Sequence, residues 1–262
     1  MSVKFKFTAL AGALALAMGG TAMANTTLTA SSPTGDVWIN VVDATNNTSF
    51  LYDTGVSLAS FNGAGSYTYN FTGDANYAAF VGAEGGSDVI DYSVLAGTKS
   101  TATPAVGTVL FTSNQNPGPV IGTSISNALT NANGFLSLAN GVTSTTTNSV
   151  TLGSSNTWGQ VAYEQTVSTN LGVQWTQPGT GVGVLAGTAA SFYDEASNAL
   201  RSGSTFATIT QLAGTWNFNA VTGIATYGSS APVPLPTPLL LLLSGVGLMG
   251  VVARRNKSEA AV

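Results

Sequence analysis

The feature that most limits how this chain can fold is its division into short runs of β-branched and aromatic residues. About a dozen such runs, each the length of one strand, are separated by clusters of Gly, Asn, Pro and Ser. Residues 66–71, for example, alternate aromatic with polar side chains. Because these side chains fit a half-buried pleated surface, the sequence predicts an all-β fold. A single β-sandwich, of which a jelly roll is one form, is the simplest architecture for these strands.

The predicted strands are residues 37–42, 66–71, 77–81, 89–95, 108–112, 149–152, 160–167, 173–176, 188–193, 205–210, 214–218 and 224–227. The last two are expected to form a hairpin around residues 220–222. One helix is predicted between Thr123 and Gly134, because Ile125, Leu129 and Ala132 recur there at helical spacing.

The N-terminal segment, residues 1–24, has the order of a secretory signal peptide. Lys4 and Lys6 precede an apolar run of about a dozen residues, which is too short to span a hydrocarbon core. The run is followed by Ala22 and Ala24 in a small-x-small pattern, so we expect signal peptidase to cleave after Ala24. The alternative interpretation is an N-terminal core helix.

Cysteine and histidine are both absent from the chain. Disulfides, thiolate nucleophiles and the usual zinc and haem ligands are therefore excluded, as are Ser-His and Cys-His catalytic pairs. An exported protein without disulfides must rely on an apolar core, and the 207 residues from 25 to 231 are enough to form one.

The charge of the predicted body, residues 25–231, is strongly negative. It holds ten acidic residues but only two basic ones, Lys99 and Arg201, which gives a net charge of −8. Such a surface cannot neutralise phosphates, so nucleic acid is excluded as a partner, and anionic lipid surfaces are disfavoured. Divalent cations and neutral glycans are better matched to it.

The C-terminal segment, residues 232–262, has three parts. A stiff motif comes first: Val233, Pro234, Leu235 and Pro236. An uncharged apolar run, residues 239–253, would rise about 22 Å as a helix and nearly spans a bilayer if counted from Leu235. Three basic residues follow it: Arg254, Arg255 and Lys257. This basic end is expected on the cytoplasmic side, which leaves the body outside the inner membrane.

This tail resembles the PEP-CTERM family of sorting tails, in its variant with Val-Pro-Leu-Pro. It departs from the commonest form by having Leu235 in place of Glu, and from the variant by Thr237 in place of Ala. The resemblance implies that an exosortase, an integral membrane enzyme of Gram-negative bacteria, recognises the motif and cuts near it. The protein would then reach the cell surface or the exopolysaccharide matrix of a biofilm. An ordinary C-terminal membrane anchor is the alternative.

The tightest acidic group in the body is Glu84, Asp88 and Asp91, on a Gly-rich stretch. Three carboxylates so close together could bind calcium, although their spacing does not match an EF-hand loop. The alternative is a solvated loop that leads into a strand.

Paired carboxylates could also cleave a glycoside. The adjacent pair Asp194 and Glu195 is one candidate, and Glu164 lies in a predicted strand. Adjacent residues on a strand point to opposite faces, however, so Asp194 and Glu195 should not share a site.

The four tryptophans could stack on sugar rings if they were exposed, but are better assigned to the core: Trp38, Trp158, Trp175 and Trp216.

Three hypotheses follow from the sequence. The first is a non-catalytic structural or adhesive protein of the surface or extracellular matrix. The second is a carbohydrate-binding β-sandwich, with or without calcium. The third is a carboxylate-based enzyme that cleaves glycans.

Overall fold

The computed structural model describes residues 35–83, 88–100, 105–142, 148–153 and 164–228. The predicted signal peptide and the predicted sorting tail lie outside this part of the chain. No helix among the described residues has both the length and the apolar character needed to cross a membrane.

Ten strands form one antiparallel sheet in the described part of the chain. Nine of them follow the order β3-β10-β9-β8-β5-β4-β1-β2-β6 across the sheet. The tenth strand, β7, lies outside this order and pairs with β4. The strands are β1 (Asp36–Asp43), β2 (Thr48–Ser57), β3 (Tyr67–Asn70), β4 (Ile90–Lys99), β5 (Gly107–Ser113), β6 (Ser149–Leu152), β7 (Val184–Leu185), β8 (Ala190–Ser197), β9 (Thr208–Asn219) and β10 (Ile224–Gly228). The predominance of β structure is thus confirmed.

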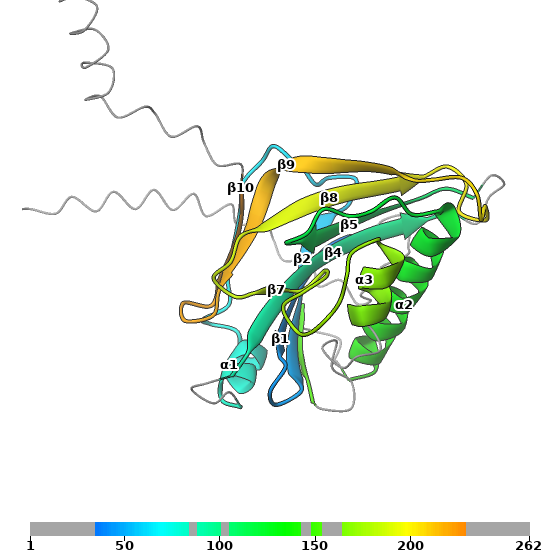
Figure 1. Cartoon of the computed structure of the whole chain (residues 1–262). Helices are drawn as coiled ribbons and strands as arrows, with labels where there is room; N and C mark the ends of the chain where they lie inside the picture. Colours follow the sequence, from blue (N-terminus) through cyan, green and yellow to red (C-terminus); the bar gives the residue numbers. More distant parts are fainter. Residues whose placement is uncertain (1–34, 84–87, 101–104, 143–147, 154–163, 229–262) are drawn as a thin grey trace, which may run out of the picture.

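Helices cover one face of the sheet. α2 (Gly122–Val142) and α3 (Glu164–Asn170) lie side by side on this face, while the short α1 (Ala75–Val81) lies at one end of the molecule (Figure 1). Trp38, Leu95 and Phe111 of the sheet belong to the same apolar core as Leu129 and Phe135 of α2. We call this side of the sheet the helix-covered face.

The opposite face encloses an aromatic core, because the sheet curls until its two ends approach each other. Tyr52 of β2 lies 5.9 Å from Tyr69 of β3 and 4.9 Å from Phe71, measured between ring centroids. Trp216 and Tyr227, from β9 and β10, are buried in the same cluster. The two ends of one continuous sheet therefore face each other across a core, as the layers of a sandwich do.

Most predicted strands are present, and the predicted hairpin is formed by β9 and β10. The predicted helix is also present as α2, but it continues through Gly134 to Val142. Burial of Phe135, Leu136 and Ala139 explains the extension, because packing outweighs the local cost of a glycine.

Three strand predictions are wrong. Residues 77–81 lie in α1, where the Asp74 carboxylate accepts hydrogen bonds from the backbone of Asn76 and Tyr77 and caps the helix. The predicted strand 160–167 is contradicted by α3, which begins at Glu164. Residues 173–176 form no strand, whereas β2 was not predicted at all.

Candidate functional site

The predicted calcium group is not assembled by the described residues. Glu84 lies outside them, and Asp88 accepts a hydrogen bond from the side chain of Asn46 at 2.7 Å. Asp91 is instead buried on the helix-covered face of β4, where it accepts from the backbone of Gly179 at 2.9 Å. In this part of the chain no three acidic side chains converge in a way that could hold a metal.

Asp91 has a different acidic neighbour, Glu164, at the start of α3. Both carboxylates are bound by one glycine-rich segment, residues 179–183: Gly179 donates to Oδ2 of Asp91 at 2.9 Å, and Gly183 donates to Oε1 of Glu164 at 3.1 Å. An added Cβ at Gly183 would lie 2.1 Å from that Glu164 oxygen, so a larger residue here would displace the carboxylate. The segment and the two carboxylates therefore form one packed unit.

Both carboxyl groups of this unit are harder to ionise than usual. Burial raises the pKa of Asp91 to about 7, although the Gly179 N–H opposes the change. Burial also raises the pKa of Glu164 well above its ordinary value, and repulsion from Asp91 raises it further. The Gly183 N–H and the nearby indole N–H of Trp175 act in the opposite direction, although the indole does not reach good hydrogen-bond geometry.

Two neutral polar residues lie on the same face of the sheet. Asn40 of β1 is directly opposite Ser93 of β4, and Ser93 is two residues from Asp91, so all three side chains point to the helix-covered face. Asn40 is 0% and Ser93 1% exposed, yet neither side chain has a hydrogen-bond partner among the described residues. Within the same part of the chain, Oδ1 of Asp91 and Oε2 of Glu164 also have no hydrogen-bond partner.

Asp194 and Glu195 point to opposite faces of β8, in agreement with the prediction. Glu195 lies opposite Val109 and Ile209 on the helix-covered face, whereas Asp194 lies opposite Leu110 and Thr210. Glu195 is fully buried, and burial raises its pKa to about 8. These two carboxyl groups therefore do not form a joint site.

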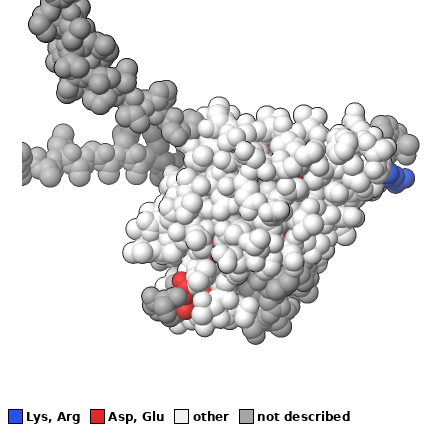
Figure 2. Space-filling model, in the orientation of Figure 1, with Lys and Arg blue, Asp and Glu red and all other residues white. Residues whose placement is uncertain are grey.

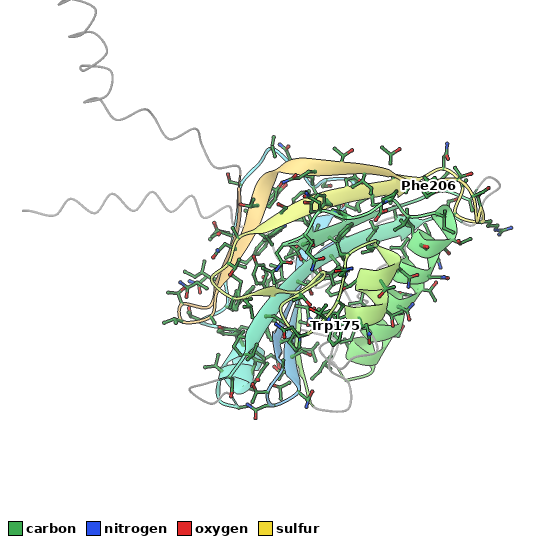
Figure 3. All side chains as sticks on the ribbon, in the orientation of Figure 1. Trp175 and Phe206 are labelled. Carbon is green, nitrogen blue, oxygen red and sulfur yellow. The ribbon has the colours of Figure 1, made fainter. Side chains whose placement is uncertain are left out.

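The tryptophans are mainly core residues. Trp38 and Trp216 are buried in the two apolar clusters, as predicted. Trp175 is half-buried, beside α3 (Figure 3), and Trp158 lies outside the described residues.

Phe206 is the most exposed aromatic side chain among the described residues, with 64% of its surface accessible. Its backbone is nevertheless fixed: Phe206 forms an isolated β-bridge with Ile121, and Ala207 donates a hydrogen bond to the Val120 carbonyl at 2.9 Å. The ring lies at one end of the sheet, away from Trp175 (Figure 3). The exposed ring is therefore carried by a backbone that is held in place on both sides.

Phe206 borders a shallow pocket of about 550 Å³. Hydroxyl, amide and small apolar groups line it, from Thr98, Ser100, Val106, Gly107, Thr108, Ala196, Ser197, Asn198, Thr205, Phe206 and Thr208. None of these described lining residues is charged. The pocket thus combines one exposed ring with neutral hydrogen-bonding groups.

Four of these lining residues form a row that crosses four strands. Thr98 of β4 pairs with Thr108 of β5, which pairs with Ala196 of β8, which pairs with Thr208 of β9. Strand spacing makes this row roughly 14 Å long. We call this row, with Phe206, the threonine face.

The wider surface around these elements carries little charge. In the view of Figure 2, acidic atoms gather near α1 and basic atoms at the opposite end of the molecule, and most of the described surface between them is uncharged.

The threonine face was not singled out from the sequence, although a signal is present. In residues 205–210, strict alternation places Phe206 on the same side as Thr208 and Thr210, and Ala207 and Ile209 on the other. A phenylalanine on the polar side of a strand departs from the usual pattern, and this departure could have indicated an exposed ring.

The residues predicted for export and sorting all lie outside the described part of the chain: Ala22, Ala24, Val233, Pro234, Leu235, Pro236, Arg254, Arg255 and Lys257. Comparison with known proteins gives no match to a protein-family model, to a curated protein or to a solved structure.

Proposed function

We propose that this protein is a non-catalytic component of the bacterial surface or extracellular matrix and that it contacts neutral polysaccharide through the threonine face. The observation that carries the glycan assignment is the exposed, backbone-fixed ring of Phe206 beside an uncharged pocket lined by hydroxyl groups. Sugars present apolar C–H faces and many hydroxyls, so a ring with neighbouring threonines matches both.

The size and charge of the face favour a neutral chain over an anionic one. The row of roughly 14 Å is long enough for a short oligosaccharide segment. The body has a net charge of −8 and no cation among the described pocket residues, so it would repel an anionic polysaccharide.

The route to the surface is supported by the sequence. The signal peptide ending at Ala24 and the PEP-CTERM-like tail from Val233 to Lys257 belong to an exported protein that an exosortase processes. The resemblance also supports a Gram-negative host that makes exopolysaccharide and forms biofilms.

A glycan-cleaving activity is less well supported. Asp194 and Glu195 face opposite sides of β8, and Asp91 and Glu164 are each only 1% exposed, so a polysaccharide would not reach them.

Affinity electrophoresis of the purified chain through gels that contain dextran, hydroxyethylcellulose or alginate tests the proposal. We expect retardation by at least one neutral polymer and none by alginate. Phe206→Ala should weaken the retardation about tenfold, which corresponds to about 1.4 kcal/mol. The control is Val221→Ala, which shortens another exposed side chain, 96% accessible, in the β9–β10 turn.

The same measurement can contradict the proposal. Free migration through every neutral polymer would exclude glycan binding of this kind. Equal retardation of the native chain and Phe206→Ala would place binding elsewhere on the surface.

A further inference from the structure

We propose that the helix-covered face holds one calcium ion between β1, β4 and α3, bound by oxygen atoms of Asn40, Ser93, Asp91 and Glu164. This inference is independent of the glycan assignment, because the residues lie on the opposite face of the sheet from the threonine face.

The first argument is the unpartnered oxygens. Four buried oxygens have no hydrogen-bond partner in the part of the chain that the structure describes: the side-chain oxygens of Asn40 and Ser93, Oδ1 of Asp91 and Oε2 of Glu164. A buried polar group that lacks a partner costs roughly 1–3 kcal/mol, so four in one region need an explanation. A cation bound by all four oxygens would explain why they lack hydrogen-bond partners.

The second argument is the pairing of two acids without a base. Buried carboxylates are normally paired or bound to a metal. Within the described part of the chain the basic residues lie elsewhere: Lys99 donates to Thr130 on α2 at 3.1 Å, and Arg201 is exposed. A divalent cation would balance both carboxylates.

The third argument is orientation. The backbone N–H groups of Gly179 and Gly183 each bind one oxygen of a carboxylate, and the other oxygen accepts no hydrogen bond of good geometry from the described residues. In metal sites, a hydrogen bond to one oxygen of a metal-binding carboxylate fixes the orientation of the other oxygen toward the metal. Because Gly183 has no Cβ, the Glu164 carboxylate has room to accept this hydrogen bond.

The donor set indicates which metal fits. All four donors are oxygens from carboxylate, amide and hydroxyl groups, and neither nitrogen nor sulfur ligands are available. Calcium accepts six to eight such oxygens in flexible geometry and can complete its shell with water or carbonyl groups, whereas magnesium demands a near-ideal octahedron. The site differs from the group predicted from the sequence, with which it shares only Asp91.

Thermal unfolding of the full chain, purified in non-ionic detergent, tests this inference in EDTA and in calcium chloride. A ligand at about one hundred times its Kd is expected to raise Tm by roughly 5–10 °C in a domain of this size. Metal analysis after dialysis should find one calcium per chain, and magnesium should give a smaller shift.

Asp91→Asn should abolish the calcium-dependent shift. Its matched control is Asp53→Asn, which makes the same change at another buried carboxyl on β2 with an unpartnered oxygen. Ser93→Ala removes one ligand and little volume, so it should reduce the shift even if Asp91→Asn does not fold.

An unchanged Tm and no bound calcium in the native chain would overturn the inference and would indicate that the two carboxyls share a proton instead. A shift of equal size in Ser93→Ala and in Asp91→Asn as in the native chain would also overturn it. Neither result bears on the retardation experiment with Phe206→Ala.

Discussion

Glu195 shows how much a single buried carboxyl group can control stability. No charged group among the described residues is paired with it, and burial raises its pKa from 4.5 to about 8. Between these values the folded chain holds a proton that the unfolded chain has released. Stability is therefore greatest below pH 4.5 as far as Glu195 is concerned, and it falls as the pH rises to about 8. One pH unit within this window corresponds to about 1.4 kcal/mol.

We predict that Glu195→Gln removes part of this pH dependence. At pH 8 the variant should have a higher urea midpoint than the native chain and an unfolding free energy that is several kcal/mol larger. At pH 4.5 the unfolding free energies of the two chains should be nearly equal. Urea unfolding in EDTA at both pH values measures the difference. Parallel pH profiles of the two chains would show that Glu195 ionises without penalty in the folded state.

At the residue scale, the sequence predicted which face of a strand a side chain occupies better than it predicted which distant residues lie beside it. It correctly excluded a shared site for Asp194 and Glu195, because alternation along a strand is a local property. It could not place Glu164 beside Asp91, because that contact depends on how α3 and residues 179–183 pack on the sheet. Asn40 and Ser93 were also missed, since their partnership follows from strand register.

At the scale of elements, the closure of the sheet depends on aromatic packing. Phe71, which directly follows β3, is fully buried and contacts Phe50 of β2 at 5.1 Å and Phe218 of β9 at 6.2 Å between ring centroids. Packing between these rings therefore connects the two ends of the sheet.

We predict that Phe71→Ala lowers the unfolding free energy by roughly 3–5 kcal/mol, because it leaves a cavity at this junction. The matched control is Phe206→Ala, the same change at an exposed ring, which should stay within about 0.5 kcal/mol of the native chain. Urea unfolding gives both values. A cost below 1 kcal/mol for Phe71→Ala would mean that the ends of the sheet are held by other contacts.

The elements were predictable where the local pattern matched the tertiary role. Residues 149–152 coincide with β6, and residues 224–227 lie within β10. Residues 77–81 misled because Tyr77 and Phe80 form one buried helical face within a run that is also the length of a strand. β2 was missed because Asp53 and Gly55 interrupt its apolar pattern, although the Asp53 carboxylate satisfies the backbone N–H of Gly55 within the strand.

At the scale of the whole molecule, we predict that the mature protein has lost both ends. Mass spectrometry should find an N-terminus at Asn25 and, in cells that contain an exosortase, a C-terminus near Pro236. The reason is the order of motif, apolar run and basic end that follows the body. A strain without exosortase is the control. Secreted protein that still contains Lys257 would contradict cleavage by an exosortase and would favour an ordinary membrane anchor.

On the proposed route of export, the pairing of β3 with β10 sets the order of events. Tyr67 and Tyr227 are direct partners although 160 residues separate them along the chain. A chain that crosses the membrane from its N-terminus presents β3 long before β10, and non-local pairings of this kind form late. The sheet therefore gains its final strand only when residues up to Gly228 have emerged, five residues before Val233. On the proposed route, completion of the fold and arrival of the predicted tail at the membrane are nearly the same moment.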